Sequence, residues 1–445
     1  MSQRAPGKKQ LALVNILGGM VCGYCTAIIA GATAGIDADW GKMSSFMSGL
    51  VTASIILGAA IGSLVGGLIA DRIGRQKSAI VMSLGALVFS LAEAVSPNMA
   101  FLLVMRLLLG LFIGLISVVC PLYVSETAPS ESRGFLGSFF QVSLTFGIVL
   151  AYVAGYVLRP EAIGRGDPYG GGAMLSWRVM FGMGAIAPLF LLYVALFVMQ
   201  ESPVWLEQRA TSGYRPSLDA STTFSNPFSE KQDAHGWRGL FSAASLLPLS
   251  IGIALAFDLQ ATGINGIVFY LPKLLTEAGL GDLAPILTIV VGIFNFLSTF
   301  FALFLVDRAG RKPLLLIGTA ILGVSLLLVG IAFYALQGKA KGWFAFAAIL
   351  IFHLGFEVGP GSLFWIIIAE IFPLGVRSEA NGFINLVNNL LNLLVCLLFP
   401  IVFAAAKGAV FFFFAVMAVI AFVYIFFAYR ETKNELPLQQ LLTLQ

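Results

Sequence analysis

Twelve long apolar runs, separated by short polar segments, dominate this chain of 445 residues and restrict the folds open to it. A helix needs about 20 mostly apolar residues to cross the hydrocarbon core of a bilayer. The apolar fraction of 59% suffices for about twelve such helices, and only 11% of the residues are charged. The sequence therefore predicts an all-α membrane protein with twelve transmembrane helices. This composition and the small net charge of +4 exclude a soluble enzyme and a nucleic-acid-binding protein.

The apolar runs form two groups of six, divided by the longest polar segment. They cover 11–33, 45–70, 78–96, 99–124, 135–158 and 176–199, and then 241–272, 284–306, 313–336, 343–369, 380–405 and 409–429. We expect two pseudo-symmetric six-helix bundles. Their predicted bounds are 1–200 for the N-terminal bundle, 201–240 for a cytoplasmic linker, 241–430 for the C-terminal bundle and 431–445 for a short tail.

An internal repeat of charged motifs supports the two homologous halves. An Asp-Arg-x-Gly-Arg loop follows the second run and recurs after the eighth; a Glu and an Arg seven residues apart follow the fourth run and the tenth; and a Glu ends the sixth run and the twelfth. Arginine can bind a carboxylate bidentately, so we predict an inner charge gate that holds the halves together and opens when they rock apart. Its members are Asp71, Arg75, Glu126, Arg133, Glu201, Asp307, Arg311, Glu370, Arg377 and Glu431. The alternative is that these are solvated loop charges that only set topology.

The distribution of lysine and arginine predicts the orientation. Most of the 26 basic residues fall in loops on the side of both termini, and basic residues favour cytoplasmic loops. We therefore predict a multi-pass protein of the plasma membrane or the bacterial inner membrane, with both termini in the cytoplasm. The N-terminal apolar run lacks a small-residue cleavage site and is interpreted as a retained first helix.

Polar side chains within the apolar runs are mostly amides, and they indicate the kind of solute. Polar groups are costly inside a bilayer, and an amide both donates and accepts hydrogen bonds, as the hydroxyls of a neutral sugar do. The residues are Gln141, Asp258, Gln260, Asn265, Asn295, His353, Glu357, Trp365, Asn381, Asn385, Asn388, Asn389 and Asn392. For any single asparagine the alternative is a hydrogen bond between helices.

Together, several motifs resemble the sugar porter family of the major facilitator superfamily over most of the chain. They are the two Asp-Arg-x-Gly-Arg loops, Pro121 to Pro129 with Arg133 and Gly134, Glu201 to Leu206, Gly263 to Asn265 with Phe269 and Tyr270, Glu357 to Gly361 with Trp365, and Glu431 to Lys433. The resemblance implies alternating access to a central sugar site, with a hexose such as glucose as the expected substrate.

Residues that match the family motifs imply where the sugar binds. The implied substrate-binding residues are Gln141, Gln260, Asn265, Asn295, Glu357, Trp365, Asn388 and Asn392, and the implied outer gate is Phe269 and Tyr270. Two positions depart from the family pattern: Leu259 replaces a glutamine, and Asn389 replaces a tryptophan. Both departures bear on which sugar is selected.

The expected mode of transport is uniport, because Cys25 occupies the place of the aspartate that proton-coupled members carry beside an arginine corresponding to Arg106. A buried thiol stays protonated at neutral pH and is a poor proton carrier. The alternative is proton symport through Asp258 or Glu357, both inside predicted spans. Asp258 could instead be a buried acid paired with a neighbouring helix.

Other classes of function fit the sequence less well. A sugar sensor is less expected because only Arg430 to Gln445 follow the last run. An enzyme is not expected, because no nucleophile and base are paired and no metal-binding motif occurs. The pair Cys22 and Cys25 has redox spacing but lies in an apolar run and is interpreted as two buried small residues. We expect no cofactor and no metal, a small sugar and the lipid bilayer as partners, no nucleic acid, and a functional monomer.

Overall fold

A computed structural model describes residues 7–129, 132–160, 171–211, 239–372 and 376–431. Within these ranges, twelve helical segments are long and apolar enough to cross a membrane, and every element of regular structure is helical. The predicted all-α fold is confirmed. Much of the predicted linker and nearly all of the predicted tail lie outside the described residues.

The helices fall into an N-terminal and a C-terminal set. The N-terminal set is α1 (Lys8–Ala27), α2 (Ile29–Trp40), α3 (Ser45–Ile73), α4 (Arg75–Ala94), α5 (Met99–Thr127), α6 (Arg133–Val157), α8 (Gly171–Met183), α9 (Ile186–Phe197) and the short α10 (Pro203–Thr211). The C-terminal set is α12 (Ala243–Ala261), α13 (Ile264–Leu275), η2 (Thr276–Leu280), α14 (Ala284–Ala309), α15 (Arg311–Ala335), α16 (Gly338–Phe356), η3 (Glu357–Gly361), α17 (Ser362–Ile371), α18 (Arg377–Ala406) and α19 (Ala409–Ala428).

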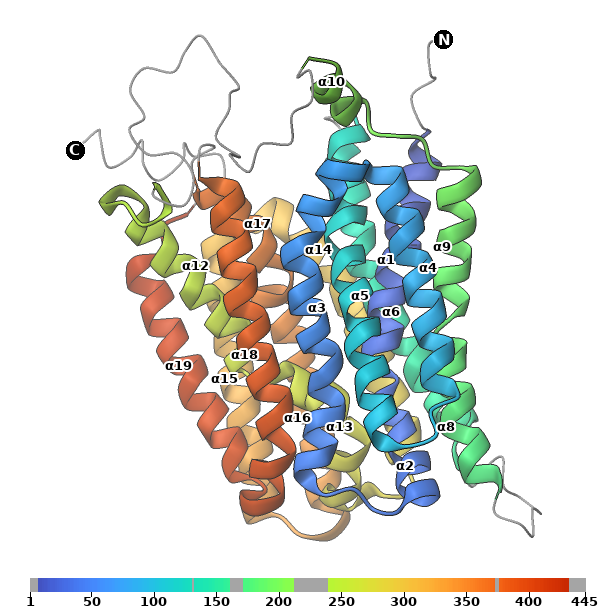
Figure 1. Cartoon of the computed structure of the whole chain (residues 1–445). Helices are drawn as coiled ribbons and strands as arrows, with labels where there is room; N and C mark the ends of the chain where they lie inside the picture. Colours follow the sequence, from blue (N-terminus) through green and yellow to red (C-terminus); the bar gives the residue numbers. More distant parts are fainter. Residues whose placement is uncertain (1–6, 130–131, 161–170, 212–238, 373–375, 432–445) are drawn as a thin grey trace.

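The two sets lie side by side as two bundles (Figure 1). They meet where α3 packs on α18 and where α6 packs on α14. We call the end that holds the start of α1 and the end of α19 the terminal face, and the opposite end the distal face (Figure 1). Gly49 of α3 allows a close approach, because a Cβ there would collide with the backbone of Leu397 in α18.

Two membrane-spanning segments of the C-terminal bundle are interrupted by glycine. Gly263 is left-handed, with φ of 76°, and separates α12 from α13. Gly359 lies within η3, with non-helical φ and ψ of −103° and −113°, and separates α16 from α17. Irregular backbone at membrane depth is tolerated where it is buried in protein or lines a cavity.

The repeated Asp-Arg-x-Gly-Arg loops have the same backbone geometry in both halves. Gly74 has φ of 95° and ψ of 162°, and Gly310 has φ of 90° and ψ of 163°. These angles belong to a region that is essentially restricted to glycine. A Cβ on Gly74 would also collide with the carboxylate of Glu201, and one on Gly310 would lie 2.8 Å from Oε2 of Glu431. Each loop therefore requires glycine for two reasons: its backbone conformation and the lack of space for a Cβ atom.

We predict that Gly74→Ala destabilises the protein by about 1 to 3 kcal/mol, because alanine is strained at this backbone conformation. Thermal unfolding of the purified protein in detergent measures the effect. Gly67→Ala is the matched control, because Gly67 lies within helix α3 and a Cβ there meets nothing within 4 Å. Equal melting temperatures for the two variants would contradict the explanation of the loop.

Candidate functional site

Three amide side chains predicted to bind substrate lie together in the C-terminal bundle. Asn265 Nδ2 donates a hydrogen bond to Gln260 Oε1 at 2.9 Å, and Gln260 Nε2 donates one to Asn388 Oδ1, also at 2.9 Å. They come from α13, α12 and α18, and the break at Gly263 places Asn265 beside Gln260. Gln260 and Asn388 are each only 5% exposed. We call Gln260, Asn265 and Asn388 the amide trio.

A second group of predicted residues surrounds the break in the tenth span. Asn295 Oδ1 of α14 lies 3.2 Å from Nδ1 of His353 in α16. Glu357 begins η3, four residues after His353, and is 1% exposed. Among the described residues, neither Nε2 of His353 nor Oε2 of Glu357 has a hydrogen-bond partner. These buried polar atoms are available to a ligand.

Gln141 joins this region through its own helix. Thr145, one turn after Gln141 on α6, lies 3.4 Å from Thr299 through the two hydroxyl oxygens. Thr299 follows Asn295 by one turn on α14 and donates a hydrogen bond to its backbone carbonyl. The contact crosses from the N-terminal to the C-terminal bundle and places Gln141 on the α6 segment that packs against α14.

The remaining two predicted residues stand apart from these groups. Asn392 Oδ1 accepts a hydrogen bond from the thiol of Cys396 at 3.2 Å, within α18. Trp365 on α17 is 50% exposed and packs edge-on against Phe364, with the ring centroids 4.8 Å apart. The structure therefore brings the amide trio together and links Asn295 with His353, but gives Trp365 and Asn392 no hydrogen bond to either group among the described residues.

The predicted outer gate connects the two bundles toward the distal face. Tyr270 Oη lies 2.9 Å from Thr52 Oγ1 and 3.0 Å from the carbonyl oxygen of Ser48, both in α3. Phe269, the other predicted gate residue, is buried. The hydroxyl of Tyr152 in α6 donates to the carbonyl of Val268 at 2.8 Å. Hydrogen bonds of Tyr152 and Tyr270 thus join α13 to α6 and α3 of the N-terminal bundle.

The predicted inner charge gate forms two similar clusters at the terminal face. In the N-terminal bundle, Arg75 binds Glu126 bidentately, with Nε to Oε2 at 2.8 Å, and also pairs with Asp71 at 3.0 Å. In the C-terminal bundle, Arg311 binds Glu370, with Nη2 to Oε1 at 2.9 Å. The bidentate pairing expected of the repeated arginines is present in both halves.

Glu201 and Glu431, two predicted members of the charge gate, each bind the backbone at the start of a helix. Glu201 accepts hydrogen bonds from the backbone amides of Arg75 and Gln76, the first residues of α4. Glu431 does the same for Arg311 and Lys312 at the start of α15, at 2.9 and 3.0 Å. A carboxylate at a helix N-terminus is favoured by the unpaired amides and by the helix dipole.

Both clusters join helices of their own bundle. The contacts of Arg75 and Arg311 described above each stay within one half of the chain. Arg133 is exposed, while the side chains of Asp307 and Arg377 lie outside the described residues. Contacts between the two clusters therefore stay a prediction for another conformation.

Two buried acids complete the polar interior. Glu93 of α4 is 1% exposed, and its Oε1 lies 3.6 Å from Nη1 of Arg106 in α5. Asp258 of α12 accepts a hydrogen bond from Thr319 of α15 at 2.9 Å, as expected for an acid paired with a neighbouring helix. Sequence reasoning identified Asp258 but missed Glu93. Glu93 is the one acid in the predicted span 78–96, and that isolation was the available signal.

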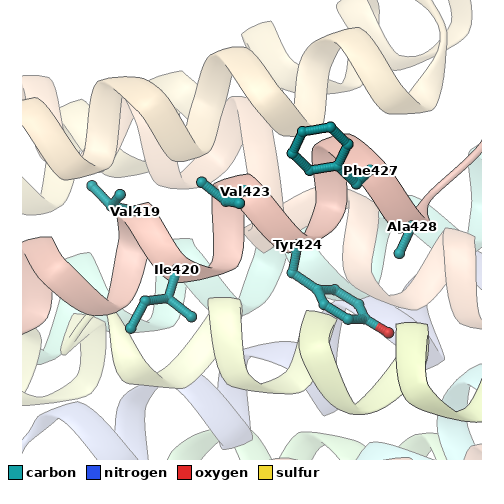
Figure 2. A pocket seen from close by; sticks show the side chains of 6 residues that line it. All are labelled: Val419, Ile420, Val423, Tyr424, Phe427 and Ala428. Atoms are coloured by element: carbon teal, nitrogen blue, oxygen red, sulfur yellow. The ribbon is translucent and has the colours of Figure 1, made fainter.

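A shallow groove on the outer surface of α19 is apolar and separate from these groups. Figure 2 shows its lining, which is Val419, Ile420, Val423, Tyr424, Phe427 and Ala428. The hydroxyl of Tyr424 donates a hydrogen bond to Ser250 at 2.8 Å. Apolar side chains on a membrane-spanning helix suit contact with lipid chains, so the groove is not a candidate site for a polar solute.

Comparison with known proteins identifies the family. Residues 11–440 match the family described as "Sugar (and other) transporter". The chain is 32% identical to the glucose transporter GlcP of Staphylococcus epidermidis, over 96% of this chain and 95% of that protein. It is 31% identical to the arabinose-proton symporter of Bacillus subtilis, over 94% of this chain and 91% of that protein.

A solved structure has the same fold. The inward open conformation of the xylose transporter XylE from E. coli superimposes with a TM-score of 0.79 at 26% identity, covering 98% of this chain and 100% of that one. The twelve-helix arrangement is therefore that of the major facilitator superfamily.

Proposed function

The chain belongs to the sugar transporter family, and from this premise we propose that it carries a neutral monosaccharide by alternating access. A hexose such as glucose is the first candidate. The bilayer is its other partner, and the functional unit is one chain. Both termini lie in the cytoplasm, so the terminal face is the inner face of a plasma or bacterial inner membrane.

The amide trio is the observation that carries this proposal. Three amides from three helices meet at the break between α12 and α13, where the backbone is already irregular. A sugar hydroxyl donates and accepts hydrogen bonds at once, and an amide offers both functions on one planar group. A cation would instead require several carboxylates, and Glu357 is the only acid among the eight predicted substrate-binding residues.

Alternating access follows from the contacts at the two ends of the bundles. Toward the distal face, Tyr270 of α13 forms a hydrogen bond with Thr52 of α3 and so joins the two bundles. At the terminal face, the charge clusters join helices within each bundle. Rocking the bundles would break the contact of Tyr270 with α3 and bring the clusters toward one another. The clusters then form the inner gate in the opposite conformation.

The mode of transport depends on whether a proton-binding acid lies beside Arg106. Uniport is the mode expected from Cys25, which takes the place of the aspartate of the first span. Glu93 of α4 places another carboxylate beside Arg106, at 3.6 Å. Proton symport is the second candidate, and this observation favours it.

Counterflow in liposomes tests the proposed function. Vesicles that contain the purified protein are loaded with unlabelled D-glucose and diluted into a trace of labelled D-glucose. A transient uptake of label shows exchange of the sugar, and unlabelled xylose, arabinose, galactose and inositol then compete in turn. The proposal would be contradicted if labelled D-glucose showed no counterflow and none of the other solutes interacted with the protein.

For the binding site, we predict that Gln260→Ala raises the half-saturating sugar concentration about five- to tenfold. The variant removes a hydrogen-bonding group worth about 1 kcal/mol and releases both Asn265 and Asn388. Gln337→Ala is the control, because Gln337 is an exposed residue between α15 and α16 without a side-chain capping bond. Normal saturation by Gln260→Ala would remove the amide trio from the site.

For the gate, we predict that Glu370→Gln slows transport several-fold while equilibrium binding of the sugar stays unchanged. The variant weakens the hold on Arg311, whose position decides how the cluster meets its counterpart. Glu277→Gln serves as the control, since Glu277 forms an exposed ion pair with Lys407 at 3.7 Å and such pairs contribute little. Unchanged turnover in Glu370→Gln would argue against the gate.

A further inference from the structure

The Glu93–Arg106 pair is the most unusual buried charge in the N-terminal bundle. Both side chains are at most 2% exposed, inside the membrane-spanning part of the bundle. At 3.6 Å the pair is an ion pair but not a hydrogen bond. Among the described residues, Glu93 Oε1 and both Nη atoms of Arg106 lack a hydrogen-bond partner. Such a loosely paired buried charge is a weak source of stability.

Few ionisable groups surround Glu93. Arg106 of α5 and Cys25 of α1 interact with it directly, and Tyr270 of α13 lies beyond Arg106; the other ionisable groups on elements packed against this region are Tyr24 of α1 and Arg178 of α8. Arg178 is bound to the backbone carbonyl of Ser96 and pairs with Asp39, and Tyr24 is bound to the carbonyl of Met180. On α9 the one ionisable residue, Tyr193, is exposed on the outer surface. Arg106 is therefore the charge that governs Glu93.

Arg106 also connects Glu93 with the gate. Arg106 Nε donates a hydrogen bond to the carbonyl of Val51 at 2.9 Å. Val51 lies in the turn of α3 that runs from Ser48 to Thr52, and these two residues are the partners of Tyr270. The same turn of α3 is thus contacted by Arg106 of its own bundle and by the gate tyrosine of the other bundle.

We propose that Glu93 binds and releases the proton that drives sugar transport, with Arg106 as the group that transmits its charge to the distal gate. A proton from the medium binds a carboxylate oxygen and yields the neutral acid. Arg106 then loses its counter-charge and shifts its hold on Val51, which loosens the α3 turn beneath Tyr270. When the proton leaves to the opposite side, the carboxylate re-forms and the pair closes the gate. This proposal rests on the proposed sugar transport.

Asp258 and Glu357 fit this role less well. Each is buried in the C-terminal bundle, and the described contacts include no cation beside either of them. Neither is connected by a described hydrogen bond to the turn of α3 that holds Tyr270. The alternative for Glu93 itself is a brace between α4 and α5, which would affect stability but not coupling.

Proton-driven accumulation in liposomes tests the proposal with the full chain and labelled D-glucose. Wild-type protein should concentrate the sugar when an inward proton gradient is imposed and lose this ability with a protonophore. Glu93→Gln should exchange D-glucose without a gradient yet only equilibrate it when the gradient is present. Cys25→Ser should behave as wild type, because a serine hydroxyl keeps the contacts of the thiol with Ser90 and the carbonyl of Gly184, and neither group releases its proton at neutral pH.

The double variant Glu93→Gln with Cys25→Asp separates coupling from bracing. Cys25 Sγ lies 3.9 Å from Ser90 Oγ, one turn before Glu93 on α4, so an aspartate there returns a carboxylate to the same pocket. We expect it to restore part of the accumulation. If Glu93→Gln loses sugar exchange and the double variant does not restore it, the ion pair serves only the stability of the protein. This result would overturn the proposal.

Infrared difference spectra make the test independent of the sugar. Between mildly acidic and neutral pH, wild-type protein should show a carbonyl band of a protonated carboxylic acid that is absent in Glu93→Gln. The proposed substrate fails alone if D-glucose is not exchanged while this band is present. Coupling through Glu93 is overturned if the band persists in Glu93→Gln or if wild-type protein only equilibrates the sugar. It is also overturned if accumulation is lost in Asp258→Asn but kept in Glu93→Gln.

Discussion

The cost of placing a polar group in hydrocarbon governs every functional feature of this protein. A membrane supplies no water to satisfy an amide, a carboxylate or a broken helix, so each such group must find a partner or serve a ligand. The amide trio forms its hydrogen bonds across three helices, and one carboxylate oxygen of Asp258 accepts a hydrogen bond from Thr319. Glu93 and Arg106 are paired with each other but lack hydrogen bonds at several atoms among the described residues, and we propose a functional role for this pair.

The two homologous halves have kept the same scaffold and differ in their interiors. Gly74 and Gly310 adopt the same backbone conformation in the two loops. Glu201 caps the N-terminus of α4 in the same way as Glu431 caps that of α15. The helix breaks at Gly263 and Gly359, by contrast, lie in the C-terminal bundle, where the amides gather. The N-terminal bundle holds the buried ion pair instead. Sugar recognition and proton binding are thus proposed for different halves, with Tyr270 and α3 between them.

The sequence predicts the fold closely because hydropathy and membrane thickness determine it. The predicted span 284–306 coincides with a membrane-spanning segment, and the repeated charged motifs correctly predict two halves. The site was harder to predict, since partners depend on side-chain positions. Glu201 looks like a partner for arginine in sequence but caps α4 in space. Glu93 was missed because its partner, Arg106, follows on the next helix and its distance from Cys25 is a property of the folded bundle.

The most direct test of the central claim, that the amide trio binds a sugar, is a structure determined by electron cryomicroscopy with D-glucose present. We expect density for one sugar whose hydroxyls contact the side chains of Gln260, Asn265 and Asn388. We also expect the amides to exchange their mutual hydrogen bonds for bonds to the sugar. Density bound elsewhere, with the trio still hydrogen-bonded to itself, would contradict the claim.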